Sequence, residues 1–126
     1  MKTITYESQE EQDKTVSAFL MMFLEYAQDI GLFMLLSRIV KVQMKEVVYS
    51  VLNKAQTVLA SLVMGCKHTK AINEVLGEEE IAANYLGMFR FPEQSQINRY
   101  LTRFSAENVA QLGEVHKQLL DRKSVV

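Results

Sequence analysis

The chain of 126 residues contains one proline and five glycines, and this scarcity restricts the folds open to it. An all-β chain needs a turn about every ten residues, and Gly and Pro supply many of those turns. Between the glycines of this chain, apolar residues recur at helical spacing. We therefore predict a mainly all-α protein, a multi-helix array of about six helices joined by tight glycine turns.

The apolar spacing predicts the helices one by one. The expected ranges are 18–37 with a break near Gly31, 49–63 ended by Gly65, 69–76 capped by Thr69 and ended by Gly77, 78–86 ended by Gly87, 95–103, and 106–121. Each helix should turn an apolar stripe toward the core. The residues expected inside are Ala18, Phe19, Met22, Phe23 and Tyr26, then Val51, Leu52, Ala55, Val58, Leu59, Leu62 and Val63, and finally Ile97, Tyr100, Leu101 and Phe104.

Residues 40–48 have a different period. Val40, Val42 and Met44 alternate with polar residues, which is typical of an extended segment, and residues 3–6 are a possible pairing partner. The first residues are polar and acidic, so we expect an N-terminal tail over 1–14 and a single helical domain over 15–126.

Charge and composition narrow the class of protein. The net charge is −1, but residues 38–70 carry +5 between blocks of −4 at 1–37 and 71–89. Such a block is either a basic face or a chance difference between solvated faces. The apolar stretch 16–36 is interrupted by Glu25, Gln28 and Asp29, which predicts a buried helical region and no membrane span. The acidic start and the lone Cys66 predict a cytoplasmic protein.

Catalytic and metal-binding patterns are sparse. Cys66 and His68 lie two positions apart without a second ligand pair, so a zinc site would lack half its ligands. The other histidine, His116, falls in an apolar arc with Leu112 and Val115, where a packed or interface role is expected. No glycine-rich phosphate loop is present. We predict no catalytic residue, no metal site, no cofactor and no small-molecule substrate.

The segment 92–104 carries the clearest functional pattern. Opposite its apolar arc lie short amides, hydroxyls and arginines without an acid, which are groups that bind base edges and phosphates. With the preceding short helix it would make a helix-turn-helix-like unit. The alternative is an ordinary solvated helix, in which Arg99 pairs with Glu93 or Glu107. The candidate DNA contacts are Gln94, Ser95, Asn98, Arg99 and Arg103, with Lys67 and Lys70 as phosphate contacts.

Residues 62–120 resemble the N-terminal region of bacterial insertion-sequence transposases of the DDE class. The most specific element is Phe91-Pro92-Glu93-Gln94-Ser95 followed by Asn98-Arg99-Tyr100-Leu101. The supporting matches are Leu62-Val63-Met64-Gly65-Cys66, Ala71-Ile72-Asn73, Leu86-Gly87 and Val115-His116-Lys117-Gln118-Leu119-Leu120. Residues 23–54 match more loosely.

The resemblance implies a helical domain that precedes an RNase H-like core, on which three acids bind two metal ions. The first of those acids would lie beyond Val126, so the resemblance assigns no catalytic residue here and suggests a truncated product or an isolated domain. We therefore expect a non-catalytic region that binds transposon-end DNA. The alternative is an interaction module that dimerises or inhibits transposase subunits, with Met88–Phe91 and the face around His116 as its contact surface.

Overall fold

A computed structural model of the chain describes residues 2–44 and 48–125, with side chains described over 15–44 and 48–121. All regular secondary structure in this part of the chain is helical, which confirms the predicted all-α class. The helices are α1 (Lys2–Asp29), α2 (Leu32–Ile39), α3 (Val51–Val63), α4 (Ala71–Val75), α5 (Glu80–Tyr85), α6 (Gln94–Arg103) and α7 (Ala106–Val125).

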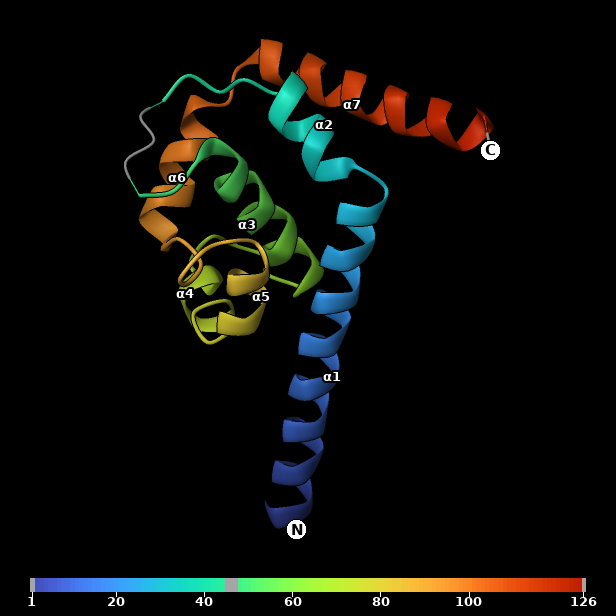
Figure 1. Cartoon of the computed structure of the whole chain (residues 1–126). Coiled ribbons are helices and arrows are strands. Elements are labelled where there is room, and N and C mark those ends of the chain that lie inside the picture. The colour runs from blue at the N-terminus through green and yellow to red at the C-terminus, as the bar shows by residue number, and fades with distance from the viewer. Residues whose placement is uncertain (1, 45–47, 126) are drawn as a thin grey trace.

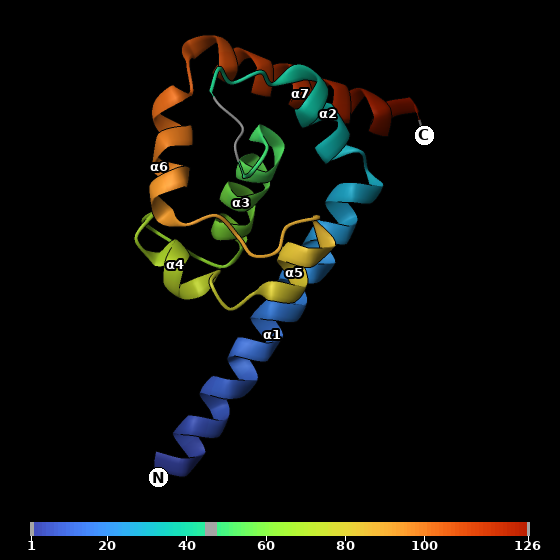
Figure 2. The same ribbon diagram turned by 60° about the vertical axis from the view of Figure 1, so that its left-hand side comes forward.

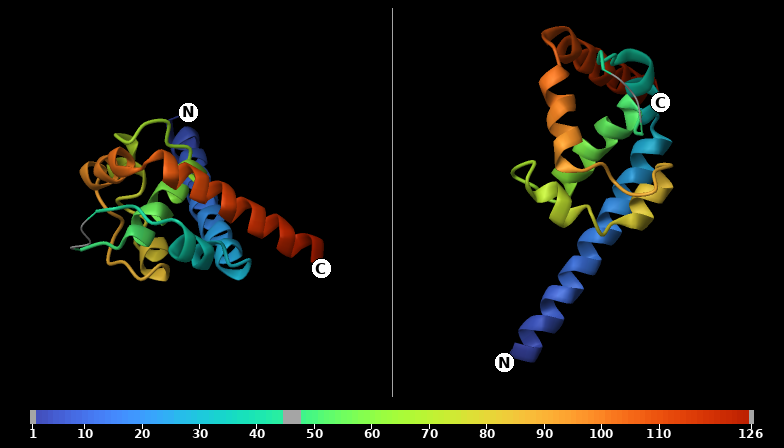
Figure 3. Two further views of the ribbon diagram at one scale, coloured as in Figure 1. Left: turned by 90° about the horizontal axis from the view of Figure 1, so that it is seen from above. Right: turned by 90° about the vertical axis from the view of Figure 1, so that its left-hand side faces the viewer.

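Helix α3 lies at the centre of the array. It packs against α1 and α2 on one side and against α6 on the other. The short helices α4 and α5 lie beyond its C-terminal end, and α7 crosses over α2 at the opposite end of the molecule (Figures 1 and 2). The N-terminal half of α1 and the C-terminal half of α7 extend beyond the other helices (Figure 3).

The first two helices separate where the sequence predicts. Gly31 has φ 82°, a left-handed conformation that favours glycine, and the helix restarts at Leu32. Gly65 and Gly87, with φ 81° and 85°, follow the ends of α3 and α5 and confirm these two glycine stops. Gly77 follows the end of α4 as expected, but without a positive φ.

The start of α1 differs from the expectation. Residues 2–14, expected as a tail, continue α1 backwards as helix. The pairing of 3–6 with the extended segment is therefore wrong, because a helical backbone already uses its N–H and C=O groups internally.

The inward face of α1 is also different from the predicted stripe. Phe19, Met22 and Tyr26 are 59%, 66% and 52% exposed, whereas the buried residues are Leu20, Leu24 and Ala27. The apolar arc of α1 is wider than the face that α2, α3 and α5 cover. The helical period locates an apolar arc but does not determine which part of it the neighbouring helices cover.

The central helix α3 buries polar side chains. Lys54, Gln56, Thr57 and Ser61 are buried beside Ala60, while most of the predicted apolar stripe is partly buried and Leu62 is 64% exposed. Thr57 Oγ donates to the Asn53 carbonyl at 2.8 Å, and the Gln56 amide oxygen accepts from Asn53 Nδ2 at 3.1 Å. Ser61 Oγ likewise donates to the Val58 carbonyl at 2.7 Å, whereas Lys54 Nζ lies 3.8 Å from Met44 Sδ outside the helix. Most of the buried polar side chains of α3 are therefore bonded within the helix, and α3 can be covered on several sides.

The segment after α2 is extended, as its alternating pattern predicts. Val40 and Val42 are buried, and Lys41 and Gln43 point outward. Lys41 N donates to the Gln111 side chain at 2.9 Å, and the Lys41 carbonyl accepts from Asn108 Nδ2 at 2.8 Å. Amide side chains of α7 thus replace the strand partner that the pattern suggested. The end of the predicted segment, 45–47, lies outside the described residues.

Other predicted boundaries shift by a few residues. Helix α4 begins at Ala71 without a side-chain cap, so Thr69 contributes only its carbonyl, which accepts from Ile72 N. Helix α5 begins at Glu80, two residues later than expected. Helix α7 continues to Val125, past the expected end at Asp121.

No single helix in the described part of the chain is both long enough and apolar enough to span a membrane. Residues 15–29 and 32–39 together have the required length and apolar character, but the two helices meet at a bend of 64°.

One residue of α6 that was predicted to lie in the core is exposed. Ile97 and Tyr100 are 1% and 4% exposed, and the Tyr100 ring meets the edge of Phe104 at 5.8 Å between centroids. Leu101 was predicted inside but is 44% exposed, because α6 packs chiefly against α3 and α4 and this leaves the margin of its apolar arc uncovered.

Truncation of Ile97 and of Leu101 to alanine should therefore change the stability by unequal amounts. Ile97→Ala should lower the free energy of unfolding by about 2–5 kcal/mol, because it opens a cavity in the core. Leu101→Ala should lower it by about 1 kcal/mol or less. Urea denaturation of both variants measures the difference, and a larger loss for Leu101→Ala would contradict the orientation of α6.

The contact between α7 and residues 40–41 gives a second stability prediction. Asn108→Ala should cost about 1–3 kcal/mol, because it removes a reciprocal cap with Ser105 and leaves the Lys41 carbonyl without its amide donor. Gln118→Ala is the matched control, since its amide bonds only to the exposed Glu114 on the same helix. An equal effect of the two substitutions in thermal unfolding would show that the amide contact contributes little.

Candidate nucleic-acid interface

The polar face of α6 is open to solvent. Burial of Ile97 and Tyr100 against the core turns the opposite side of the helix outward, so Ser95, Asn98 and Arg99 are exposed. Arg103, in the last turn, is exposed as well. The sequence-predicted orientation of these candidates is therefore correct, although the exposure does not test what they bind.

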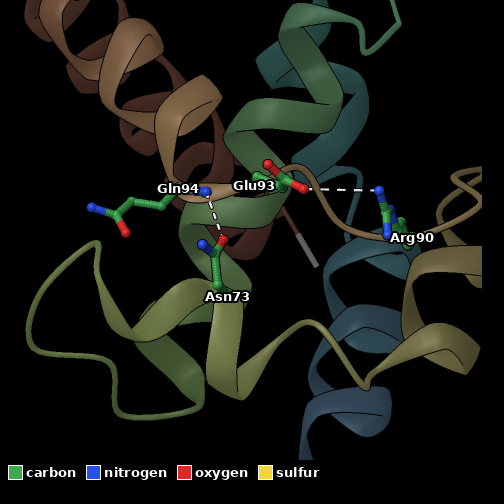
Figure 4. Close-up of polar contacts among 4 residues, drawn as sticks. All are labelled: Asn73, Arg90, Glu93 and Gln94. Carbon is green, nitrogen blue, oxygen red and sulfur yellow. Dashed lines mark hydrogen bonds and ion pairs between the residues drawn. The ribbon is translucent and has the colours of Figure 1, made fainter.

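Both arginines of α6 are available to a ligand. Neither Arg99 nor Arg103 forms a hydrogen bond or ion pair within the described part of the chain. Glu93, which the sequence offered as a partner for Arg99, lies 3.8 Å from the Arg90 guanidinium instead (Figure 4). Both members of that pair are more than half exposed, so solvent screens the attraction.

The first turn of α6 is held by a side chain of α4. Gln94 N donates to Asn73 Oδ1 at 2.8 Å, and the Gln94 side chain points away from Asn73 (Figure 4). Glu93 occupies the N-cap position but makes no side-chain cap bond. Asn73 therefore caps a helix to which it does not belong and fixes how α4 meets α6.

A groove runs along the middle and end of the polar face. Its volume is about 1150 Å³. The residues that line it are Gln43, Met44, Val48, Lys54, Gln96, Asn98, Arg99, Thr102 and Arg103. Its described lining contains three amides and three cations but no acid, which gives it the chemistry to accept an anionic or hydrogen-bonding ligand.

The structure divides the predicted site residues into two sets. Asn98, Arg99 and Arg103 line the groove together. Gln94 and Ser95 lie at the other end of α6, where it meets α4. The two lysines predicted as phosphate contacts, Lys67 and Lys70, are exposed in the segment that leads into α4, outside the groove.

The site residues predicted from the sequence omit six residues of the groove, which are Gln43, Met44, Val48, Lys54, Gln96 and Thr102. Gln43 belongs to the alternating segment, whose outward polar positions could have indicated it. Gln96 lies within the α6 motif itself. Lys54 and Met44 approach each other from α3 and the extended segment, with Nζ 3.8 Å from Sδ. No sequence pattern identifies Lys54, because that contact depends on how the segment folds over α3.

The predicted helix-turn-helix-like unit remains a prediction. It would place α5 against α6 across the connecting turn. In the structure α5 packs against α1, whereas α6 packs chiefly against α3 and α4. The bond from Asn73 makes α4 the nearer structural partner of the candidate helix.

The predicted interaction surface needs correction. Met88 and Phe91 are 5% and 4% exposed and belong to the core, so only Phe89, at 88%, presents an apolar side chain there. His116 is exposed beside the buried Val115, so a packed role is wrong, whereas the face around His116 as a contact surface stays a prediction. His116 is exposed because α7 packs mainly on α2, which covers one side of the helix.

Cysteine and histidine do not meet in a metal-binding cluster. Among the described residues, no group of three His, Cys, Asp or Glu side chains is placed to hold a metal ion. Cys66 is a free, partly buried thiol, and desolvation raises its pKa above the ordinary value, which favours the protonated form at neutral pH.

Comparison with known proteins identifies no relative. The chain matches no protein-family model, no curated protein and no solved structure. The transposase resemblance thus remains an expectation that rests on the motifs themselves.

The cap from α4 can be tested separately from ligand binding. Asn73→Ala should destabilise the protein by about 0.5–2 kcal/mol, because the first N–H of α6 loses its acceptor. Asn73→Asp keeps an acceptor oxygen and should retain most of the stability, and Glu74→Ala, at the exposed neighbouring position, serves as the control. Chemical denaturation that ranks Glu74→Ala as the most damaging of the three would contradict the capping role.

Proposed function

We propose that this chain binds double-stranded DNA through the exposed face of α6, as a non-catalytic region of a transposase. The observation that supports the proposal most directly is that the guanidinium groups of Arg99 and Arg103 have no partner within the described part of the chain and lie in a groove whose described lining contains no acid. A surface arginine without a protein partner keeps all its donors for phosphate or for a guanine edge.

The dimensions of α6 suit this role. Ten residues make a helix of about 15 Å. The major groove of B-DNA is about 12 Å wide and admits one helix. Asn98 and Arg99 lie near the middle of α6, where base edges are closest, and Arg103 lies in its last turn, where the phosphate backbone is the nearer partner.

The resemblance supports the choice of partner. In the DDE transposases that residues 91–101 resemble, a helical region precedes the catalytic core, so transposon-end DNA is the proposed ligand and transposase subunits are the proposed protein partners. The catalytic acids of that family belong to the separate core. The role proposed for these helices is therefore DNA binding in the cytoplasm without strand cleavage.

Two arginine substitutions should have different effects on DNA binding. Arg103→Ala should weaken binding to all duplexes alike and reduce the slope of log K against log salt by about one unit, because it removes one phosphate contact. Arg99→Ala should remove about 1–3 kcal/mol of discrimination between a preferred and a random duplex. Fluorescence anisotropy titrations at several salt concentrations measure both quantities.

The titrations need a preferred duplex, a competitor and a control variant. The preferred duplex is enriched from random sequences by repeated binding to the wild-type protein, and the competitor is the unselected pool. Arg38→Ala is the matched control, since Arg38 is an exposed arginine on α2, away from the α6 face. Failure to enrich any duplex, or equal effects of all three substitutions, would overturn the proposal.

A further inference from the structure

Helix α1 presents an apolar stripe that no other described helix covers. Phe19, Met22 and Tyr26 are 59%, 66% and 52% exposed, and Val16 begins the same stripe at 37%. The spacing of three and four residues places their side chains on one side of the helix, next to the buried side that carries Leu20 and Leu24. Large side chains exposed in a row are typical of helices that pack against a partner.

Helix α7 presents a second apolar face with a different shape. Val109, Leu112 and Leu120 are 61%, 40% and 53% exposed, beside the exposed His116. Next to this row, Ala110 and Gly113 are also exposed, and a Cβ added at Gly113 would meet nothing within 4 Å. This part of α7 is therefore a shallow surface that large side chains of another helix can approach closely.

The two faces differ in size and in charge in a complementary way. The large side chains of α1 match the shallow strip of α7, as knobs match holes in packed helices. The acids Glu25 and Asp29 follow the α1 stripe along one edge, and Lys117 lies one turn after Gly113 beside the strip of α7. The α7 acids Glu107 and Glu114 fall on the opposite side of that helix.

We infer that two copies of this chain associate, with the α1 stripe of each copy packed against the α7 face of the other. A two-fold axis would repeat the contact, since each copy carries both faces. Pairing α1 with α1 in parallel would instead bring the acids Glu25 and Asp29 of both copies together. The seven apolar side chains are each 37–66% exposed, so burying them would contribute on the order of several hundred Å² per copy, against the roughly 800 Å² that each partner gives to an interface of standard size.

The association can be measured without DNA. Sedimentation equilibrium over micromolar concentrations should show a dimer, and Met22→Glu should lower its association constant by about tenfold or more, because a charge would be buried at the contact. Ile81→Glu, at a 76% exposed apolar residue of α5 outside both faces, is the control and should leave the constant unchanged. Circular dichroism verifies that both variants keep the helical fold.

The pairing of α1 with α7 has its own test. In a Cys66→Ser background, a mixture of Met22→Cys and Gly113→Cys chains should form a disulfide-linked heterodimer on mild oxidation, whereas Met22→Cys alone should not cross-link. Cross-links in Met22→Cys alone would indicate α1 paired with α1 and overturn the inference. A wild-type chain that stays monomeric would also overturn the inference. If that monomer binds phosphatidylcholine vesicles, the apolar stripe of α1 contacts lipid and not a second copy.

Discussion

The fold depends on a central helix, α3, that can be covered from several sides because bonds within the helix satisfy most of its buried polar side chains. Asn53 is the key residue of α3. It forms a reciprocal cap with Ser50, its carbonyl accepts from Thr57, and its amide donates to Gln56 and, at 3.5 Å, to the Leu86 carbonyl after α5. No buried side-chain nitrogen or oxygen in the described part of the chain lacks a hydrogen-bond partner. Without these bonds, packing α1, α2 and α6 around α3 would bury polar groups that have no hydrogen-bond partner.

A second constraint joins distant parts of the chain. The backbone of Lys41 bonds to Asn108 and Gln111 in the first turns of α7, although nearly seventy residues separate them. This contact holds the extended segment in place, and Val40 and Val42 then fill the core beneath it. It also fixes where α7 begins, directly after α6 and Phe104. The position of the candidate DNA-binding helix therefore depends on an amide contact at the far end of the array from α4.

The sequence predicts local features of this fold better than packing faces. Gly31, Gly65 and Gly87 end helices as expected, because a left-handed φ is a local property of the chain. The predicted interior positions of Phe19, Met22 and Leu101 are wrong for a shared reason: each residue lies on a helix that packs mainly along one side. A periodic pattern gives the apolar arc, but the neighbours decide which part of it is buried. Asn108 was not identified either, since its role depends on the path of residues 40–41.

For the candidate site as well, the sequence does not determine where side chains lie, and the basic block at 38–70 is an example. Its described cations do not gather on one face: Lys54 is 4% exposed, Lys41 Nζ donates to the Ser37 carbonyl at 2.7 Å, and Lys67 and Lys70 lie near α4. Net charge per segment thus overstates the field that a ligand would meet. The cations that the proposed DNA site offers are the two arginines of α6, with Lys67 and Lys70 in the segment that leads into α4. DNA held by so few cations would need contacts from Asn98 and Arg99 to base edges, or a second copy of the chain, to be bound selectively.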